Sequence, residues 1–143
     1  MHLSTGEHGA QSPAEFQVTM PPSPTCAGQA RRIADALMRK WAVSSLLTGD
    51  VRLVVSELVT NAFLHSGTDV ITLSMAVQGG VLRIDVRHHV TRHRPILRRP
   101  RDDDEHGRGL LLVKAIADNR QGTWGVSCDG TTTWCELSVA VSR

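Results

Sequence analysis

The sequence feature that most constrains the fold is a hydrophobic stripe of helical period that begins near Asp50 and ends at Ser66. Residues placed at steps of about 100° bring five apolar side chains onto one broad face, namely Val51, Val54, Val55, Leu58 and Ala62. The stretch therefore predicts an amphipathic helix that buries one side.

Three polar residues, Glu57, Asn61 and His65, follow the edge of this stripe at intervals of four. Residues four apart lie one above the other on a helix, so a carboxylate, an amide and an imidazole form a row. Such a row suits a helix whose rim lines a pocket. The alternative is an ordinary amphipathic helix with a histidine near its end, and this stretch alone is compatible with both.

The length of 143 residues suits one domain with a real core. A net charge of +2 and 3% aromatic residues, with no tyrosine, argue against a nucleic-acid surface built on base stacking. No hydrophobic run approaches the length of a membrane helix, and the N-terminus lacks a signal-peptide core. We therefore expect a cytoplasmic protein that binds neither nucleic acid nor membranes.

The three cysteines, Cys26, Cys128 and Cys135, form neither a disulfide framework nor a CxxC metal pair. Cys128 and Cys135 can face each other across a predicted hairpin, but reduced cytosolic thiols are the favoured interpretation.

The hydrophobic periodicity predicts an element order of β-α-α-β-β-α-β-β. Residues 1–13 lack periodicity, so we expect a disordered lead before a single domain over residues 14–143. The patterns predict strands over 14–20, 70–78, 81–87, 124–128 and 132–141, and helices over 25–41, about 50–65 and 107–119. Gly79-Gly80 and Asp129-Gly130 are expected turns, and Thr48 or Gly49-Asp50 is the expected cap of the second helix. This order predicts an α+β fold, a two-layer sandwich of a mixed, mostly antiparallel sheet with three helices on one face.

A second candidate site lies at Gly107-Arg108-Gly109-Leu110, where a long loop becomes the last predicted helix. Two glycines one residue apart let the backbone approach a ligand, and a helix N-terminus offers free N–H groups and a partial positive charge. Such a terminus suits phosphate, although a lone GxG also fits a flexible hinge. Together with the helix over residues 50–65, it predicts a site for a magnesium nucleotide. Asn61 would be an oxygen ligand of the ion and Glu57 a proton acceptor.

Two motifs resemble the N-box and the second glycine box of the GHKL ATPases: Ser56-Glu57-Leu58-Val59-Thr60-Asn61-Ala62 and Gly107-Arg108-Gly109-Leu110. This superfamily includes gyrase, histidine kinases and mismatch-repair ATPases. The short length, Ala117-Asp118 and Gly130-Thr131-Thr132-Thr133-Trp134-Cys135-Glu136-Leu137 resemble the bacterial anti-sigma-factor serine kinases and small ATP-binding regulators of actinobacteria. The similarity covers about residues 16–141, nearly the whole chain.

The resemblance implies a Bergerat-type fold that binds ATP with Mg²⁺. It also implies a sigma factor held inactive, a STAS-type anti-anti-sigma protein phosphorylated on serine, and a homodimer. Carried over residue by residue, it makes Glu57 the general base and Asn61 the magnesium ligand. The polar row on the same helix adds His65 at the rim of the pocket. The residues from Gly107 to Leu110 then lie against the phosphates, and Thr132 approaches the adenine.

The first glycine box of that family departs from its pattern in this sequence. The family has an aspartate at the end of a strand, which accepts a hydrogen bond from the adenine amino group, followed by alternating glycines. Strand alternation predicts that His88 takes the aspartate position and that Asp85 points away, while Val90 and Arg92 replace glycines. A neutral imidazole accepts one hydrogen bond and a protonated one accepts none, and losing this bond would cost about 1–3 kcal/mol of ATP binding.

The predicted lid over residues 88–106 has an unusual charge pattern. Six arginines and three histidines lie between Arg87 and Arg101, and Asp102-Asp103-Asp104-Glu105 follows directly. Its arginines can reach phosphates, the acidic run can fold back on the basic run, or the loop can be solvated and disordered. The histidine spacing does not indicate a transition-metal site, and the adjacent acids disfavour DNA binding.

Two functions follow from these motifs. One is an ATP-dependent serine/threonine protein kinase of a partner-switching regulator, with Glu57 as its base. The other is a non-catalytic protein-binding module of the same fold with a degenerate adenine site. The intact N-box and second glycine box favour the kinase, and the altered first glycine box favours the binding module.

Overall fold

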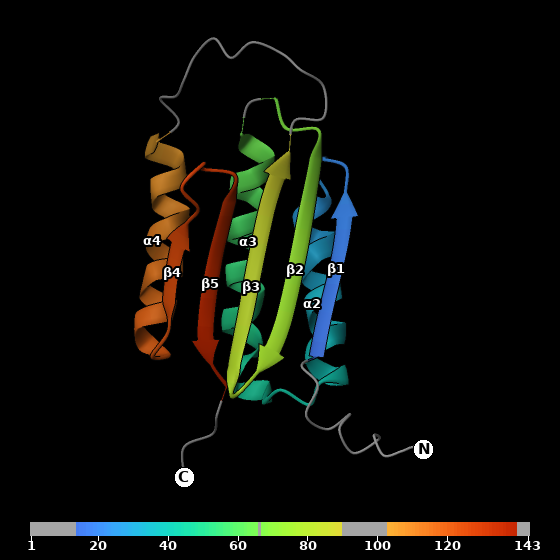
Figure 1. The fold of residues 1–143 in the computed structure, drawn as a ribbon, viewed down its shortest axis with the longest axis vertical. Coiled ribbons are helices and arrows are strands. Elements are labelled where there is room, and N and C mark those ends of the chain that lie inside the picture. The colour runs from blue at the N-terminus through green and yellow to red at the C-terminus, as the bar shows by residue number, and fades with distance from the viewer. Residues whose placement is uncertain (1–13, 66, 90–102, 140–143) are drawn as a thin grey trace.

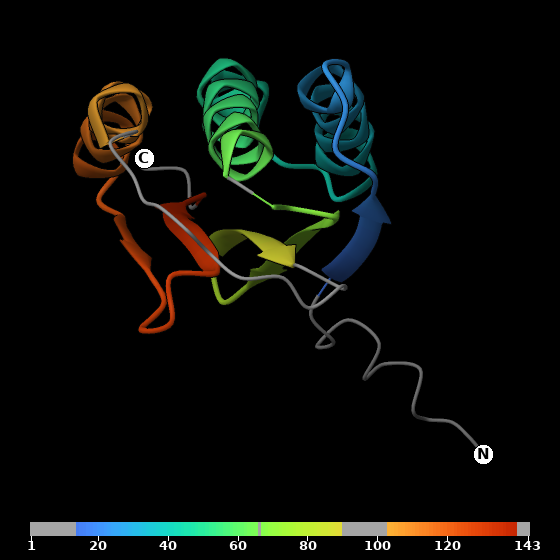
Figure 2. The ribbon, with the colours of Figure 1, turned by 90° about the horizontal axis from the view of Figure 1, so that it is seen from above.

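Within the residues that the structure describes, five strands form one open sheet and three α-helices cover one of its faces (Figure 1 and Figure 2). This computed structural model describes residues 14–65, 67–89 and 103–139, with the backbone alone for residues 103–108. The elements are β1 (Ala14–Met20), α2 (Cys26–Lys40), η2 (Ser45–Leu47), α3 (Thr48–Leu64), β2 (Val70–Gln78), β3 (Val81–His89), α4 (Asp103–Asn119), β4 (Thr123–Val126) and β5 (Thr132–Ser138). The predicted α+β two-layer sandwich is confirmed.

The strand order is β1-β2-β3-β5-β4, and every pair of neighbours is antiparallel. Gly79 and Gly80 make the β2–β3 turn with φ values of 60° and 77°, a left-handed backbone that glycine adopts without strain. Gln78 pairs with Val81 directly across this turn, so the turn sets the register of the sheet's two longest strands.

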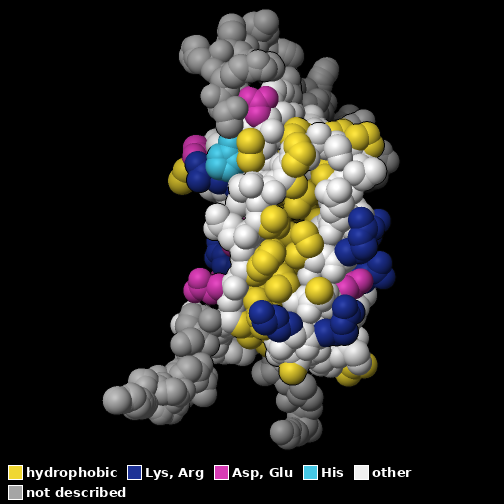
Figure 3. Space-filling view, turned by 90° about the vertical axis from the view of Figure 1, so that its right-hand side faces the viewer, with side chains coloured by type: hydrophobic (Ala, Val, Ile, Leu, Met, Phe, Trp, Pro, Cys, Tyr) yellow, Lys and Arg dark blue, Asp and Glu magenta, His cyan; other side chains and the backbone are white. Residues whose placement is uncertain are grey.

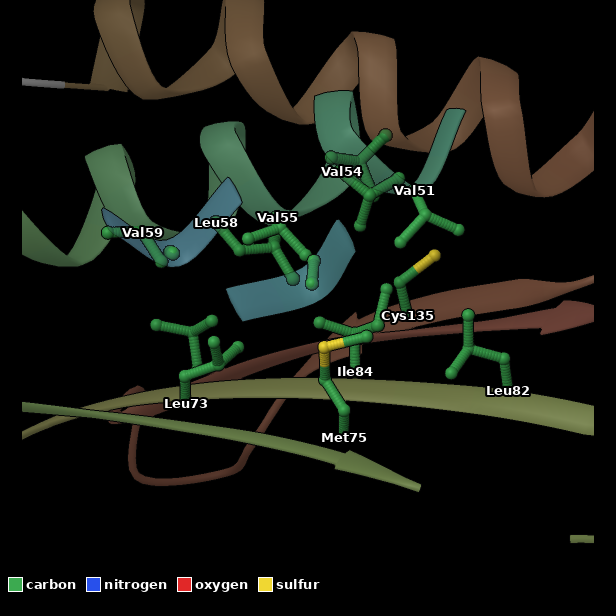
Figure 4. Close-up of a cluster of buried hydrophobic side chains, with 14 of the residues drawn as sticks. Val51, Val54, Val55, Leu58, Val59, Leu73, Met75, Leu82, Ile84 and Cys135 are labelled. Atoms are coloured by element: carbon green, nitrogen blue, oxygen red, sulfur yellow. The ribbon is translucent and has the colours of Figure 1, made fainter. Parts of the chain in front are cut away.

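The core lies between α3 and the sheet, because the whole apolar stripe of α3 is buried. Val51, Val54, Val55, Leu58 and Val59 are fully buried. They face a layer of sheet residues that includes Leu73, Met75, Leu82, Ile84 and Cys135 (Figure 4). The stripe predicted from the sequence therefore fixes the rotation of α3 about its axis.

The start of α3 differs from the prediction. Helix α3 begins at Thr48 with Leu47 at its N-cap and without a side-chain cap, so the predicted cap at Thr48 or Asp50 is wrong. The chain enters through η2, where the hydroxyl of Ser44 accepts a hydrogen bond from the N–H of Leu46 at 3.1 Å, and this turn continues into the helix.

The predicted lid is shorter than expected at both ends. His88 and His89 belong to β3, and residues 103–106 belong to α4. Residues 90–102, like the predicted lead at 1–13, lie outside the described residues.

The cysteines are free thiols. Cys135 is buried and pairs with Trp124 in the β4–β5 ladder, whereas Cys128 is exposed, so the two do not face each other. Burial raises the pKa of the Cys135 thiol to about 12 and keeps it protonated and unreactive.

Strand β1 forms one edge of the sheet beside α2, and hydrophobic side chains form a band along this side of the molecule (Figure 3). Phe16 of β1 is 36% exposed, and Val18 is only partly buried. The outer face of the sheet also carries a hollow of about 280 Å³, lined in part by Phe16, Arg83 and Asp85. In the described part of the chain, no helix is long and apolar enough to span a membrane.

The burial of α3 predicts a large stability effect at its centre. Leu58→Ala should lower the free energy of unfolding by about 2–5 kcal/mol, because the 0% exposed side chain leaves a cavity. Leu46→Ala, at a 78% exposed position in η2, is the matched control and should change it by less than about 0.5 kcal/mol. Urea denaturation measures both, and equal losses would contradict the central place of α3 in the core.

Candidate functional site

The row of polar residues predicted on α3 runs along its edge toward the end of β3. Glu57 and Asn61 are half-buried, and His65 at the end of the helix is exposed. The ring of His65 stacks on the ring of His88 from β3, with centroids 3.9 Å apart and planes 23° apart. The structure therefore brings together two residues that the sequence analysis placed separately.

Asn61 carries a buried oxygen without a hydrogen bond. Its Oδ1 is buried and has no hydrogen-bond partner within the described structure. An unpaired buried acceptor costs about 1–3 kcal/mol, and a bound ion is one way to satisfy it. A neutral amide oxygen is a hard donor of the kind that Mg²⁺ accepts, and the residue fits a magnesium ligand.

Glu57 lies one turn before Asn61 and against α4. A Cβ built on Gly109 would overlap the Oε1 atom of Glu57, so a larger residue at this position would require the carboxylate to shift. The contact joins the candidate base to the second glycine box. The two motifs, which the sequence related only by resemblance, are therefore in contact in the structure.

The predicted helix N-terminus at Gly107 is wrong. Helix α4 begins at Asp103, one turn earlier, so the backbone of Gly107, Arg108 and Gly109 lies inside the helix. The acidic residues at 103–105 suit the first turn of a helix, where the macrodipole is positive, and this favours an early start. Leu110 packs against the hydrophobic core.

His88 occupies the helix-facing side of β3, as strand alternation predicted. It pairs with Ile71 of β2, and its backbone N–H donates a 2.9 Å hydrogen bond to the carbonyl of Thr131. Burial, followed by the neighbouring charges of His65 and His89, lowers the pKa of the His88 imidazole from 6.5 to about 4. The ring is therefore neutral near pH 7.

Asp85 points to the opposite face, as predicted. Its carboxylate accepts two hydrogen bonds from the guanidinium of Arg83, at 2.8 and 3.2 Å, and Arg83 lies 4.5 Å above the ring of Trp134. A hydrogen bond from Arg83 to Glu136, at 3.0 Å, completes a cluster on the outer face of the sheet. Asp85 thus cannot replace the missing adenine acceptor.

Thr132 lies on the sheet face away from the helices, apart from the residues above. It pairs with Arg87, whereas Thr133 is 6% exposed and pairs with the buried Val86. Thr133, rather than Thr132, is therefore the helix-facing threonine of β5. In the sequence, the alternation of Thr133, Cys135 and Leu137 already indicated that these residues share the helix-facing side.

Asp129 is a further residue of the site that motif comparison missed. Its Oδ1 accepts hydrogen bonds from the Ser127 hydroxyl at 2.8 Å and from the N–H and hydroxyl of Thr131 at 3.1 and 2.8 Å. These bonds lower the pKa of the exposed Asp129 to about 2. They shape the β4–β5 turn that holds the backbone of His88, and the sequence had indicated only a turn here.

Described histidine, cysteine and acidic residues form no cluster of three or more that could hold a metal ion. His88 and His89 point to opposite faces, and His89 Nε2 lies 3.2 Å from the hydroxyl of Thr72. Magnesium bound at Asn61 would take its other ligands from phosphates and water, as this ion commonly does.

The structure is an α+β sandwich with a carboxylate and an amide one turn apart on its central helix, an arrangement that suits a nucleotide-binding domain. The sequence profile described as the histidine kinase-like ATPase domain matches residues 20–134. The chain belongs to this family, within the GHKL-type ATPase superfamily, and ATP is the nucleotide that the family binds. A comparison with proteins of curated function finds no match.

The contact between Gly109 and Glu57 predicts energetic coupling. The effect of Gly109→Ala on the free energy of unfolding should be more favourable in a Glu57→Ala background than in wild type, by at least about 0.5 kcal/mol. The reason is that the added methyl group no longer displaces a carboxylate. Urea denaturation of the double-mutant cycle measures the coupling. Gly109→Ala combined with Lys114→Ala, at an exposed position on α4, is the control and should be additive, while additivity in both cycles would contradict the contact.

The burial of His88 predicts a pH dependence of stability. Because its pKa in the folded state is about 4, below 6.5, protonation opposes folding. This contribution to stability is complete above about pH 6.5 and is lost as the pH falls toward 4. An NMR titration should show His88 neutral at about pH 5.5, with His88→Gln used to assign the signal, and a midpoint near 6.5 would contradict the burial of the ring.

Proposed function

We propose that this protein is a regulatory ATP-dependent serine kinase that phosphorylates a STAS-type anti-anti-sigma protein and holds a sigma factor inactive. One observation carries the proposal. The unpaired, buried Oδ1 of Asn61 lies one helical turn from Glu57, whose carboxylate reaches the second glycine box at Gly109. A hard oxygen donor beside a carboxylate is what phosphoryl transfer from a magnesium nucleotide requires.

In the proposed reaction Glu57 accepts the proton of the partner's serine hydroxyl. The serine oxygen forms a bond to the γ-phosphorus as the bond between that phosphorus and the oxygen bridging to ADP breaks. Asn61 would hold the magnesium ion, which would supply charge neutralisation at the phosphates. Glu57 is half-buried between α3 and α4, and this position limits its contact with bulk water.

Phosphate binding at the second glycine box requires a change at the start of α4. Residues 107–109 lie inside the helix, where their N–H groups are within the hydrogen-bonding ladder. The first turn also contains the acidic residues 103–105, which repel phosphate. We infer that nucleotide binding opens this turn and frees the N–H groups of the second glycine box.

The proposed partners, a sigma factor and a STAS-type protein, are inferred from the sequence resemblance. That resemblance rests on Ala117-Asp118 and residues 130–137. A homodimer is part of the same expectation. The edge strand β1 and the hydrophobic band beside it support this part, because an open sheet edge next to exposed hydrophobic side chains favours association (Figure 3).

A second candidate is a binding module of the same fold that sequesters its partner without catalysis. His88 favours it, because a neutral imidazole stands where the family uses a carboxylate to accept the adenine amino hydrogen. The two candidates differ in whether phosphate is transferred to the partner.

Calorimetry with Mg-ATP and a phosphorylation assay on a STAS protein test the proposal. Wild type should bind ATP, and Asn61→Ala should lose most of the magnesium dependence of binding. Glu57→Gln should bind ATP within about twofold of wild type, yet lose transfer by a factor of about 10² or more, because only the proton acceptor is removed.

Two matched variants control for general damage. Asn119→Ala at the end of α4 and Glu15→Gln on β1 are both at exposed positions and should leave ATP binding and transfer unchanged. No binding at millimolar Mg-ATP would refute the kinase. Transfer that survives Glu57→Gln would show that another group is the base, and binding without transfer in wild type would favour the binding module.

A further inference from the structure

The base selectivity of the nucleotide site, which rests on the proposed function, depends on two stacked histidines. His65 and His88 meet where the end of α3 approaches the end of β3, and their rings stack at 3.9 Å. His88 stands at the position where the family resemblance puts the group that reads the exocyclic substituent of the base. Its hydrogen-bonding chemistry therefore determines which purine is accepted.

The position of the His88 ring is well defined. Its backbone N–H is bonded to the carbonyl of Thr131, and Asp129 holds the turn that contains Thr131. On the other side the ring of His65 lies almost parallel, with an interplanar angle of 23°. The ring is half-buried and faces the helices, and the stack with His65 limits its freedom to move.

The charged and titratable groups around His88 leave it neutral. His65 on α3 and Arg87 and His89 on β3 disfavour its protonation, as does burial, and Asp129 in the β4–β5 turn opposes them. The net result is a pKa of about 4. A neutral imidazole has one N–H donor and one acceptor nitrogen and can exchange them by a change of tautomer.

Adenine and guanine differ at the position that this group reads. Adenine presents an amino donor, and guanine presents a carbonyl acceptor. At this position a carboxylate only accepts, so it pairs with the adenine amino group and repels the guanine carbonyl, whereas a neutral imidazole can pair with either group. We propose that His88, fixed against His65, makes this site accept adenine and guanine nucleotides with similar affinity.

The test is calorimetry with Mg-ADP and Mg-GDP at about pH 7.5, where diphosphates avoid turnover and His88 is neutral. Wild type should bind both within about threefold. His88→Asp should prefer ADP over GDP by about tenfold or more, because a carboxylate facing a carbonyl leaves two acceptors opposed.

His89→Asp is the matched control, since His89 lies next in the chain but contacts Thr72 on the other face of the sheet. It should leave the ratio of affinities unchanged. His65→Ala should weaken both nucleotides without changing their ratio, because it removes the ring support but not the hydrogen-bonding group.

The outcomes separate this inference from the function on which it rests. If ADP binds wild type at least tenfold more tightly than GDP, the inference is wrong and the ATP site stands. If neither nucleotide binds at millimolar concentration, both fail. Thermal melting reports whether His88→Asp is folded, and if it is not, the wild-type ratio still decides.

Discussion

The burial of α3 against the sheet is the interaction on which the rest of this structure depends. Five fully buried side chains on one stripe leave the helix a single rotation about its axis. That rotation places Glu57, Asn61 and His65 along one edge of α3. Glu57 and Asn61 are half-buried there, and the ring of His65 stacks on a histidine of β3. Hydrophobic packing thus determines the geometry of a polar site without contributing an atom to it.

Much of the fold could be predicted from the sequence because its signals were local. Alternation over β2 and β3, with a double-glycine turn between them, set the register and put His88 on the helix-facing side. Alternation applied to β5 would also have placed Thr133, rather than Thr132, on that side. The motif resemblance had pointed to Thr132, which lies on the opposite face of the sheet.

Other features depend on contacts between distant residues, which periodicity does not encode. The start of α4 at Asp103 was hidden by a polar run that looked like loop, and the cap of α3 was replaced by η2. The stack of His65 on His88 and the contact of Glu57 with Gly109 join segments more than twenty residues apart. The matched family profile identifies the ATPase domain, and the structure adds these contacts.

The contact between Glu57 and Gly109 has a mechanical consequence. A side chain that touches the backbone of a neighbouring helix must respond when that helix moves. A displacement of α4 relative to α3 therefore requires the Glu57 carboxylate to change its position. The second glycine box thus links the placement of one helix to the placement of one carboxylate on its neighbour.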